Sequence, residues 1–135
     1  MQIGQITAAL ENWAPLSFQE EYDNCGLLAG SPNTICTGVL CSLDCTEAVI
    51  DEAIEKGCNL IVSHHPIIFK GIKQFDENSY VARTVLKAIQ HNIALYAMHT
   101  NLDNLLEGVN KTLADRLHLE NRRILAPKPG FKDQE

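Results

Sequence analysis

Short apolar runs and helical stripes alternate along most of the chain. Three runs have the length and composition of buried strands, at 39–43, 59–63 and 93–98. Apolar residues recur at helical spacing in the two segments between them, which predicts helices over 45–57 and 80–92. Strands that alternate with helices in this way favour an α/β fold, with a mostly parallel sheet and helices on both faces.

Three further segments complete the predicted elements. Residues 3–14 form a helix ended by Pro15, with an apolar stripe of Ile3, Ile6, Leu10 and Trp13. Residues 25–30 form a short strand between glycines. Residues 105–119 form a last helix, with a predicted buried stripe of Leu105, Val109, Leu113 and Leu117.

Helix 45–57 carries signals at both ends. Asp44 or Thr46 is available as its N-cap, and Gly57 occupies the C-terminal position. Its predicted apolar face consists of Ala48, Val49, Ala53 and Ile54.

Composition narrows the class of protein. The 135 residues are 45% hydrophobic and 21% charged, ordinary globular usage, so we expect a single α/β domain over 1–135. A net charge of −6, with no basic block beyond residues 121–123, argues against nucleic acid or anionic membrane as a partner. No apolar stretch approaches the roughly 20 residues that span a bilayer, and the start lacks a secretion signal. The cytoplasm is therefore the expected compartment.

Five cysteines contain no C-x-x-C pair. Their odd number and mostly apolar surroundings predict reduced thiols without a disulfide. A zinc knuckle is the competing interpretation, but no second pair stands at zinc-finger spacing beside Cys41 and Cys45.

Two polar motifs follow two of the predicted strands. "SHHP" carries His64 and His65, and "HTNLD" carries His99, Asn101 and Asp103. Because ligands bind beyond the carboxyl ends of parallel strands, we expect these five residues in one crevice. Three imidazoles and a carboxylate suit a divalent metal.

Pro66 refines this prediction. It keeps His65 extended, and successive extended side chains point to opposite sides. His64 and His65 are therefore expected to serve two ions, or one ion and one hydrogen bond. Asp103 could bridge or hold one ion of a pair, and two metals roughly 3.5–4 Å apart can activate water between them.

Simpler interpretations remain open for each motif. A histidine at a strand end often has a structural role, and Asp103 could be the N-cap of the next helix. Two such strand ends in one short sheet favour metal. His91 and His118, in helical contexts, are given no role.

Other chemistries fit less well. Ser63 lies on no G-x-S-x-G elbow, and neither common glycine-rich phosphate loop is present. Cys45 could be a nucleophile only with a base beside it.

The chain resembles the NIF-three-like family, or GTP cyclohydrolase I type 2 homologues. Three segments carry the resemblance, "YDNCGLLAG", "LDCTEAVIDEAIEKGCNLIVSHHPIIF" and "IALYAMHTNLDNLLEGVNKTLADRL". The resemblance implies a NIF-three-like fold, a toroidal homohexamer and a dinuclear metal centre, with His64, His65 and Asp103 as metal ligands. Cys25 and Cys45 depart from it, since an apolar residue such as valine is expected at both positions.

The family completes its site with a histidine and a glutamate near the C-terminus, and no such segment is present here. We therefore expect the N-terminal part of a longer family member, with an incomplete site. The leading hypothesis is a metal-dependent hydrolase-like protein that uses two divalent ions, zinc, iron or manganese, to activate water against a small nucleotide-like substrate such as GTP. No catalytic residue is assigned; His99 and Asn101 would orient ligands or contact substrate. The alternatives are a metal-binding or metal-delivery protein and an oligomeric scaffold for a protein partner.

Overall fold

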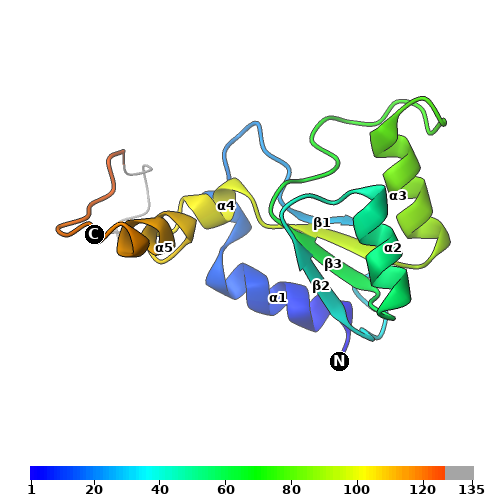
Figure 1. Ribbon diagram of the computed structural model, residues 1–135, viewed down its shortest axis with the longest axis horizontal. Helices are drawn as coiled ribbons and strands as arrows, with labels where there is room; N and C mark the ends of the chain where they lie inside the picture. Colours follow the sequence, from blue (N-terminus) through cyan, green and yellow to red (C-terminus); the bar gives the residue numbers. More distant parts are fainter. Residues whose placement is uncertain (127–135) are drawn as a thin grey trace.

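Short helices and strands follow one another through residues 1–126, which the computed structural model describes (Figure 1). In chain order they are α1 (Ile3–Trp13), the 3-10 turn η1 (Leu16–Phe18), β1 (Gly26–Ala29), β2 (Val39–Ser42), α2 (Glu47–Glu55), β3 (Leu60–Ser63), α3 (Tyr80–Gln90), β4 (Ala94–Ala97), α4 (Thr100–Asp103) and α5 (Val109–Arg116). The domain predicted over 1–135 thus includes residues 127–135, which lie outside the described part.

The four strands form one sheet in the order β1-β4-β3-β2. β2 pairs parallel with β3, and β3 parallel with β4, so the three predicted parallel strands are confirmed. β1 joins β4 antiparallel, with a register shift between Leu27 and Ala29. The sheet is therefore mixed, because an antiparallel edge strand completes an otherwise parallel α/β sheet.

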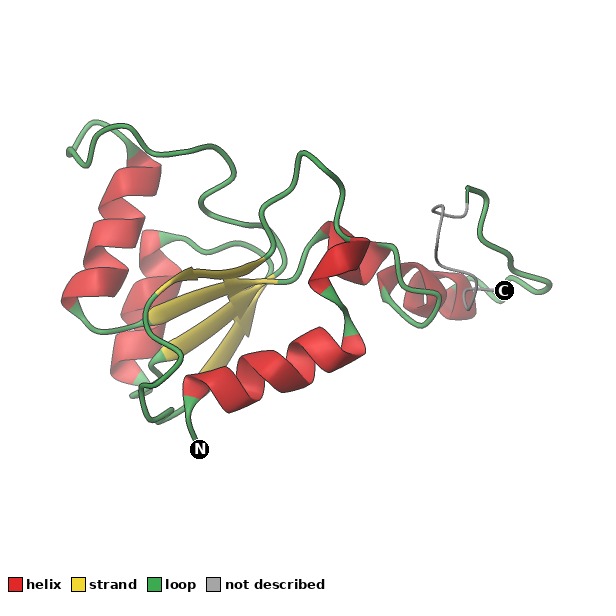
Figure 2. Cartoon of the chain, turned by 180° about the vertical axis from the view of Figure 1, so that it is seen from behind, coloured by secondary structure: helices red, strands yellow, loops and turns green. Residues whose placement is uncertain are grey.

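Helices cover both faces of the sheet, which confirms the predicted α/β class (Figure 2). Side chains of successive strand residues point to opposite faces. Ile61 and Leu95 therefore pack beneath α2 and α3, whereas Leu60 and Tyr96 pack against α1. The two clusters form the core on either side of one thin sheet.

The stripes predicted for α1 and α2 are partly wrong. Trp13 of α1 is 53% exposed, and Thr7 is buried in the same helix. In α2 the buried residues are Ile50 and Ala53, whereas Ile54 lies 38% exposed. Each helix buries only two residues, so part of each apolar face reaches solvent. Thr46, whose hydroxyl accepts the Val49 N–H at 3.3 Å, is the N-cap of α2.

The stripe predicted for the last helix is also wrong. α5 begins only at Val109, and it has no buried residue. Leu113 and Leu117 are 54% and 59% exposed. α4 and α5 lead away from the sheet, so no described layer covers this face (Figure 1). No helix within residues 1–126 is long and apolar enough to cross a membrane.

Candidate metal centre

The two histidine motifs meet at the carboxyl edge of the sheet. β3 ends at Ser63, which lies opposite Ala97, the last residue of β4. His64 follows the first strand directly, and His99 stands two residues beyond the second. The predicted placement of both histidines at one edge is therefore confirmed.

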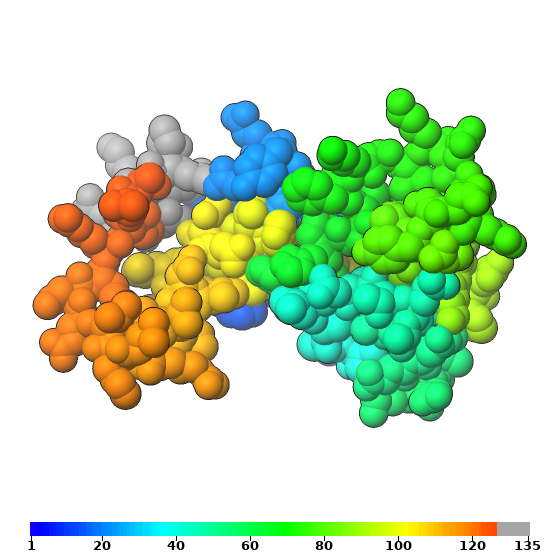
Figure 3. All heavy atoms as spheres, turned by 45° about the horizontal axis from the view of Figure 1, so that its top comes forward, coloured from blue at the N-terminus to red at the C-terminus, as the bar shows by residue number. Residues whose placement is uncertain are grey.

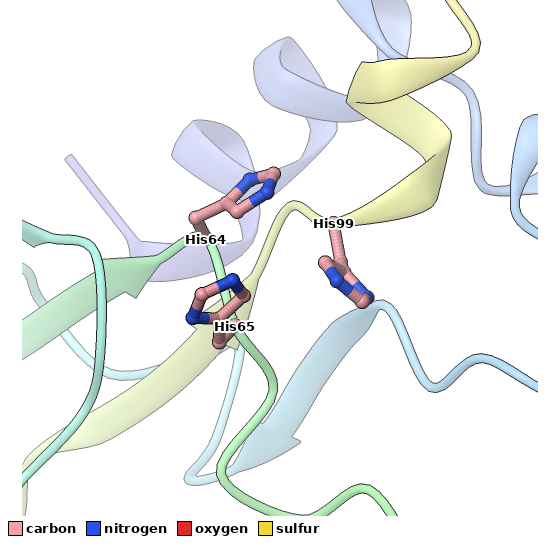
Figure 4. A group of neighbouring side chains, drawn as sticks. All are labelled: His64, His65 and His99. Carbon is pink, nitrogen blue, oxygen red and sulfur yellow. The ribbon is translucent and has the colours of Figure 1, made fainter. Parts of the chain in front are cut away.

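The rings of His64, His65 and His99 form a compact cluster (Figure 4). Their centroids lie 5.0 Å apart for His64 and His65, 5.1 Å for His64 and His99, and 5.5 Å for His65 and His99. One ligand nitrogen from each ring lies within 4.8 Å of the other two. The three side chains are thus close enough together to hold one divalent ion.

The expectation that His64 and His65 point to opposite sides is wrong. Alternation holds only within a regular strand, and β3 ends at Ser63. The Ser63 hydroxyl donates to the carbonyl of His65 at 3.0 Å, and the chain bends at residues 64 and 65. The bend brings the two adjacent rings to the same side.

Every ring of the cluster has an acceptor on its Nδ1 atom. The acceptors are Met98 O for His64 at 2.9 Å, Asp44 Oδ1 for His65 at 2.7 Å and Asp23 Oδ1 for His99 at 3.0 Å. An acceptor there favours the tautomer with hydrogen on Nδ1, which leaves the lone pair on Nε2. Metal-binding histidines are commonly held in this way, so the donor set fits a divalent ion.

Asp103 lies beside the cluster at the end of α4. Its Oδ1 atom is 3.8 Å from Nε2 of His64, and about a third of its side chain is exposed. The alternative role as N-cap of the following helix is wrong, because Gly108 is the N-cap of α5. The carboxylate therefore adds a negative charge next to Nε2 of His64.

Asn101 is fully buried beneath the cluster. Its side-chain amide donates to Ala14 O at 2.8 Å, and its oxygen accepts the backbone N–H of His99 at 3.0 Å. With both polar atoms occupied inside the chain, Asn101 cannot contact a substrate. It orients the backbone that carries His99, which is the other role expected from the sequence.

Asp23 is a site residue that sequence reasoning missed. It lies in the loop before β1, and its side chain has no exposed surface. Burial would raise the pKa of this carboxyl, but hydrogen bonds from His99, Thr100, Cys25 and Asn24 outweigh it and hold the pKa well below its ordinary value. Asp23 thus stays ionised next to His99. An isolated aspartate in a loop carries no signal by which the sequence could have identified it.

Exposed aromatic side chains border the cluster. Phe69 stands edge-on to His99 with centroids 6.3 Å apart, and Tyr22 packs on Phe69 at the same distance. Three segments surround the cluster, namely the loop before β1 (blue), the loop after β3 (green) and α4 (yellow). They lie side by side on one face of the molecule (Figure 3).

A cavity of about 970 Å³ opens on the other side of Asp103. It lies between α4, α5 and residues 119–126, and its lining includes Lys111, Arg122 and Arg123. The lining also includes the acidic residues Glu20, Glu107 and Glu120, so a small molecule in this cavity could reach Asp103 and would meet side chains of both charges.

Comparison with known proteins gives one consistent family. The family model of Duf34/NIF3 (NGG1p interacting factor 3) matches residues 1–132. A relative from Staphylococcus epidermidis, named GTP cyclohydrolase 1 type 2 homolog, is 46% identical over 131 residues, which cover 97% of this chain and 36% of the relative. The chain thus spans about a third of the length of the curated relatives it matches.

Solved structures show the same fold. A crystal structure of a Staphylococcus aureus protein superposes with a TM-score of 0.88 at 47% identity, over 95% of this chain and 41% of that one. A Bacillus cereus protein related to NIF3 also gives 0.88, at 39% identity, over 95% of this chain and 35% of that one.

Proposed function

The chain belongs to the Duf34/NIF3 family, and from this premise we propose that its histidine cluster holds divalent metal ions for a hydrolase-like reaction. One observation carries the proposal. All three rings have an acceptor on Nδ1, which leaves the lone pair of each on Nε2, and one ligand nitrogen of each ring lies within 4.8 Å of the other two.

His64, His65 and Asp103 are the proposed ligands, and the ring geometry adds His99 to them. Neutral imidazole nitrogens and a carboxylate suit zinc, iron or manganese. A bound ion would supply Lewis-acid chemistry and lower the pKa of a water molecule enough for attack at neutral pH. The chain's own contribution is to orient the three rings through their Nδ1 hydrogen bonds and to place the Asp103 carboxylate 3.8 Å from Nε2 of His64.

A dinuclear centre is part of the proposal, and it is supported by the number of candidate donors, since Asp103 lies 3.8 Å from Nε2 of His64 and two further rings lie beside His64. The resemblance to the family implies that a further histidine and glutamate, from outside these 135 residues, complete the centre. It also implies a homohexamer for the longer family members. Five free thiols suit a reducing compartment, so the proposed location is the cytoplasm.

The proposed substrate is a small nucleotide-like molecule. The name of the relatives, GTP cyclohydrolase 1 type 2 homolog, supports this class, and GTP is the first compound to test. The cavity beside Asp103 has the volume of a small-molecule site, and its lining carries both basic and acidic side chains that could bind the polar groups of such a molecule.

Metal delivery is a second candidate function. His65 is about half exposed, so an ion bound there would remain accessible for transfer. Metal binding without turnover of GTP would favour this function over the hydrolase-like one.

Calorimetric titration with zinc, manganese and iron(II) tests the site. We expect His64→Gln to weaken binding by more than the about 10- to 100-fold that loss of an outer hydrogen-bond partner costs. Asp103→Asn should also weaken it and leave the fold intact. His91→Gln is the matched control, because His91 is an exposed histidine at the end of α3. Equal affinity in wild type and His64→Gln would refute the proposed centre.

A further inference from the structure

We propose that Asp23 is a positioning residue of the metal centre, which holds the hydrogen of the His99 ring on Nδ1 and so leaves the Nε2 lone pair free to bind a cation. The inference deepens the proposed function and rests on it for the role of metal. The state of the His99 ring, however, can be measured without any metal.

The two oxygens of Asp23 are saturated by donors. Oδ1 accepts the Asn24 backbone N–H at 2.7 Å and the His99 Nδ1 hydrogen at 3.0 Å. Oδ2 accepts the Thr100 N–H at 3.0 Å, the Thr100 hydroxyl and the Cys25 thiol at 3.1 Å. An ionised carboxylate can only accept, so His99 must be the donor in this pair.

The direction of that hydrogen bond decides which nitrogen can bind a cation. A neutral imidazole carries one hydrogen. With the hydrogen on Nδ1, the lone pair of His99 lies on Nε2, and the ring centroid stands 5.1 Å from that of His64 and 5.5 Å from that of His65. An acceptor that was lost or replaced by a donor would let the hydrogen move to Nε2, where it would block coordination.

Asp23 differs from the acceptors of the other two rings. His65 is held by Asp44, whose side chain is 58% exposed, and His64 is held by a neutral backbone carbonyl. Asp23 is a fully buried carboxylate, so solvent weakens its interaction with His99 least. Its charge also makes the imidazole a stronger donor toward a cation.

Asp23 also joins two parts of the fold. Its bonds to His99 and Thr100 tie the loop before β1 to the junction between β4 and α4. These segments lie side by side on the face that carries the cluster (Figure 3). The His99 ring is thereby held from a second element as well as from its own backbone.

The test compares Asp23→Asn with Cys25→Ala in the full chain. Asparagine keeps the shape of the side chain but places an NH₂ group among hydrogen-bond donors. Cys25→Ala removes one hydrogen bond to Asp23 and leaves the hydrogen bond between Asp23 and His99 in place. Long-range proton–nitrogen NMR spectra of the metal-free proteins identify the tautomer of each histidine, and His99→Gln assigns the His99 signals. Calorimetry with zinc then measures affinity.

We expect the Nδ1–H tautomer for His99 in wild type and in Cys25→Ala, a shift toward Nε2–H in Asp23→Asn, and an about 10- to 100-fold loss of zinc affinity in that variant only. The Nε2–H tautomer of His99 in wild type would overturn the inference. This measurement does not depend on whether any variant folds. Unchanged tautomer and affinity in Asp23→Asn would overturn it as well. If the tautomers are as expected but the wild-type protein binds no zinc, the proposed function is refuted. Asp23 would then still be the residue that fixes the tautomer of His99.

Discussion

At the scale of the residue, the five cysteines differ in their surroundings, although the sequence alone does not distinguish them. All five cysteines are free thiols, as their number and spacing predict. Cys41 is exposed on β2, whereas Cys45 is only 3% exposed and its burial raises the pKa of the thiol to about 11. Because the thiolate is the reactive form, the two should differ strongly in reactivity.

We expect Cys41 to be alkylated first and Cys45 last when the native protein is treated with iodoacetamide at pH 8. Peptide mass spectrometry after timed quenching measures the order. In urea the two should react at similar rates, because unfolding removes the burial. Equal rates in the native protein would contradict the burial of Cys45.

A pH effect on stability follows from the same residue. The folded protein resists ionisation of Cys45 between its ordinary pKa of 9.0 and the raised pKa of about 11, whereas the unfolded chain ionises there. We expect the free energy of unfolding to decline across this window more steeply in wild type than in Cys45→Ala. The comparison uses urea unfolding at pH 8, 9 and 10. Parallel pH dependences would show that Cys45 is not buried.

Asn101 should prove important for stability. Asn101→Ala would leave the Ala14 carbonyl and the His99 N–H without partners in the interior, at a cost of about 2–4 kcal/mol. Asn12→Ala, at an exposed position of α1, is the control and should change stability by less than about 0.5 kcal/mol. Urea unfolding measures both; equal effects would contradict the role given to Asn101.

Sequence reasoning identified part of the site at this scale. His64, His99 and Asp103 stand in short polar motifs directly after strands, so their positions follow from the topology of a parallel sheet. Asp23 approaches His99 only because β1 pairs with β4, and no local pattern encodes that contact. The bend that unites His64 with His65 depends on a side-chain hydrogen bond from Ser63, which periodicity does not predict.

At the scale of the element, periodicity located α1, α2 and α3 correctly, began the last helix too early and missed α4, and it failed to say which faces are covered. α2 and α5 both carry apolar stripes, but only α2 packs on the sheet. A stripe shows that a face can be buried. Whether that face is buried depends on whether another layer of the fold packs against it, and the local sequence pattern carries no information about that layer.

Matched substitutions in these two helices should show the difference. Ile50→Ala in α2 removes a fully buried side chain and should cost about 2–5 kcal/mol. Leu113→Ala in α5 removes a side chain that is 54% exposed and should cost less than about 0.5 kcal/mol. Urea unfolding of both variants provides the measurement. A large cost at Leu113 would mean that α5 is covered in solution.

Gly30, just after β1, constrains the edge of the sheet. Its φ is +105°, and a Cβ placed there would lie 2.6 Å from Cβ of Ala94. Gly30→Ala should therefore destabilise the protein by about 1–3 kcal/mol or more. Gly71→Ala, where nothing lies within 4 Å, is the control and should change stability little. Similar melting temperatures for the two variants would contradict the close approach of β1 to β4.

At the scale of the whole molecule, the described part has one complete region and one uncovered region. The sheet with α1, α2 and α3 has a core on both faces, and the candidate metal centre lies at its carboxyl edge. α5 and the segment after it expose large apolar side chains, namely Val109, Leu113, Leu117, Leu119 and Leu125. The fold class and the three parallel strands could be predicted because each of these strands is marked locally, whereas the place of β1 in the sheet and the arrangement beyond β4 could not.

Metal should stabilise the whole molecule if the proposed centre forms. Ligand at about 100 times its Kd adds about 2.7 kcal/mol to the free energy of unfolding. We therefore expect zinc to raise the melting temperature of wild type and of His91→Gln by several degrees, and EDTA to reverse the rise. His64→Gln should show little change. A rise of equal size in His64→Gln would place the stabilising ion elsewhere.

The pairing of the first strand with the last also sets the order of events during synthesis. Gly26 of β1 pairs with Ala97 of β4. β1 is therefore synthesised early but cannot pair until β4, near the end of the described chain, has left the ribosome. Contacts of such long sequence separation form late, because the intervening chain must close first. Asp23 stands just before β1, and His99 just after β4, so the closure that completes the sheet also brings these two together. We therefore expect a nascent chain that ends before β4 to bind metal no better than an unfolded peptide, and the ability to select a metal ion to arise in the same step as the finished fold.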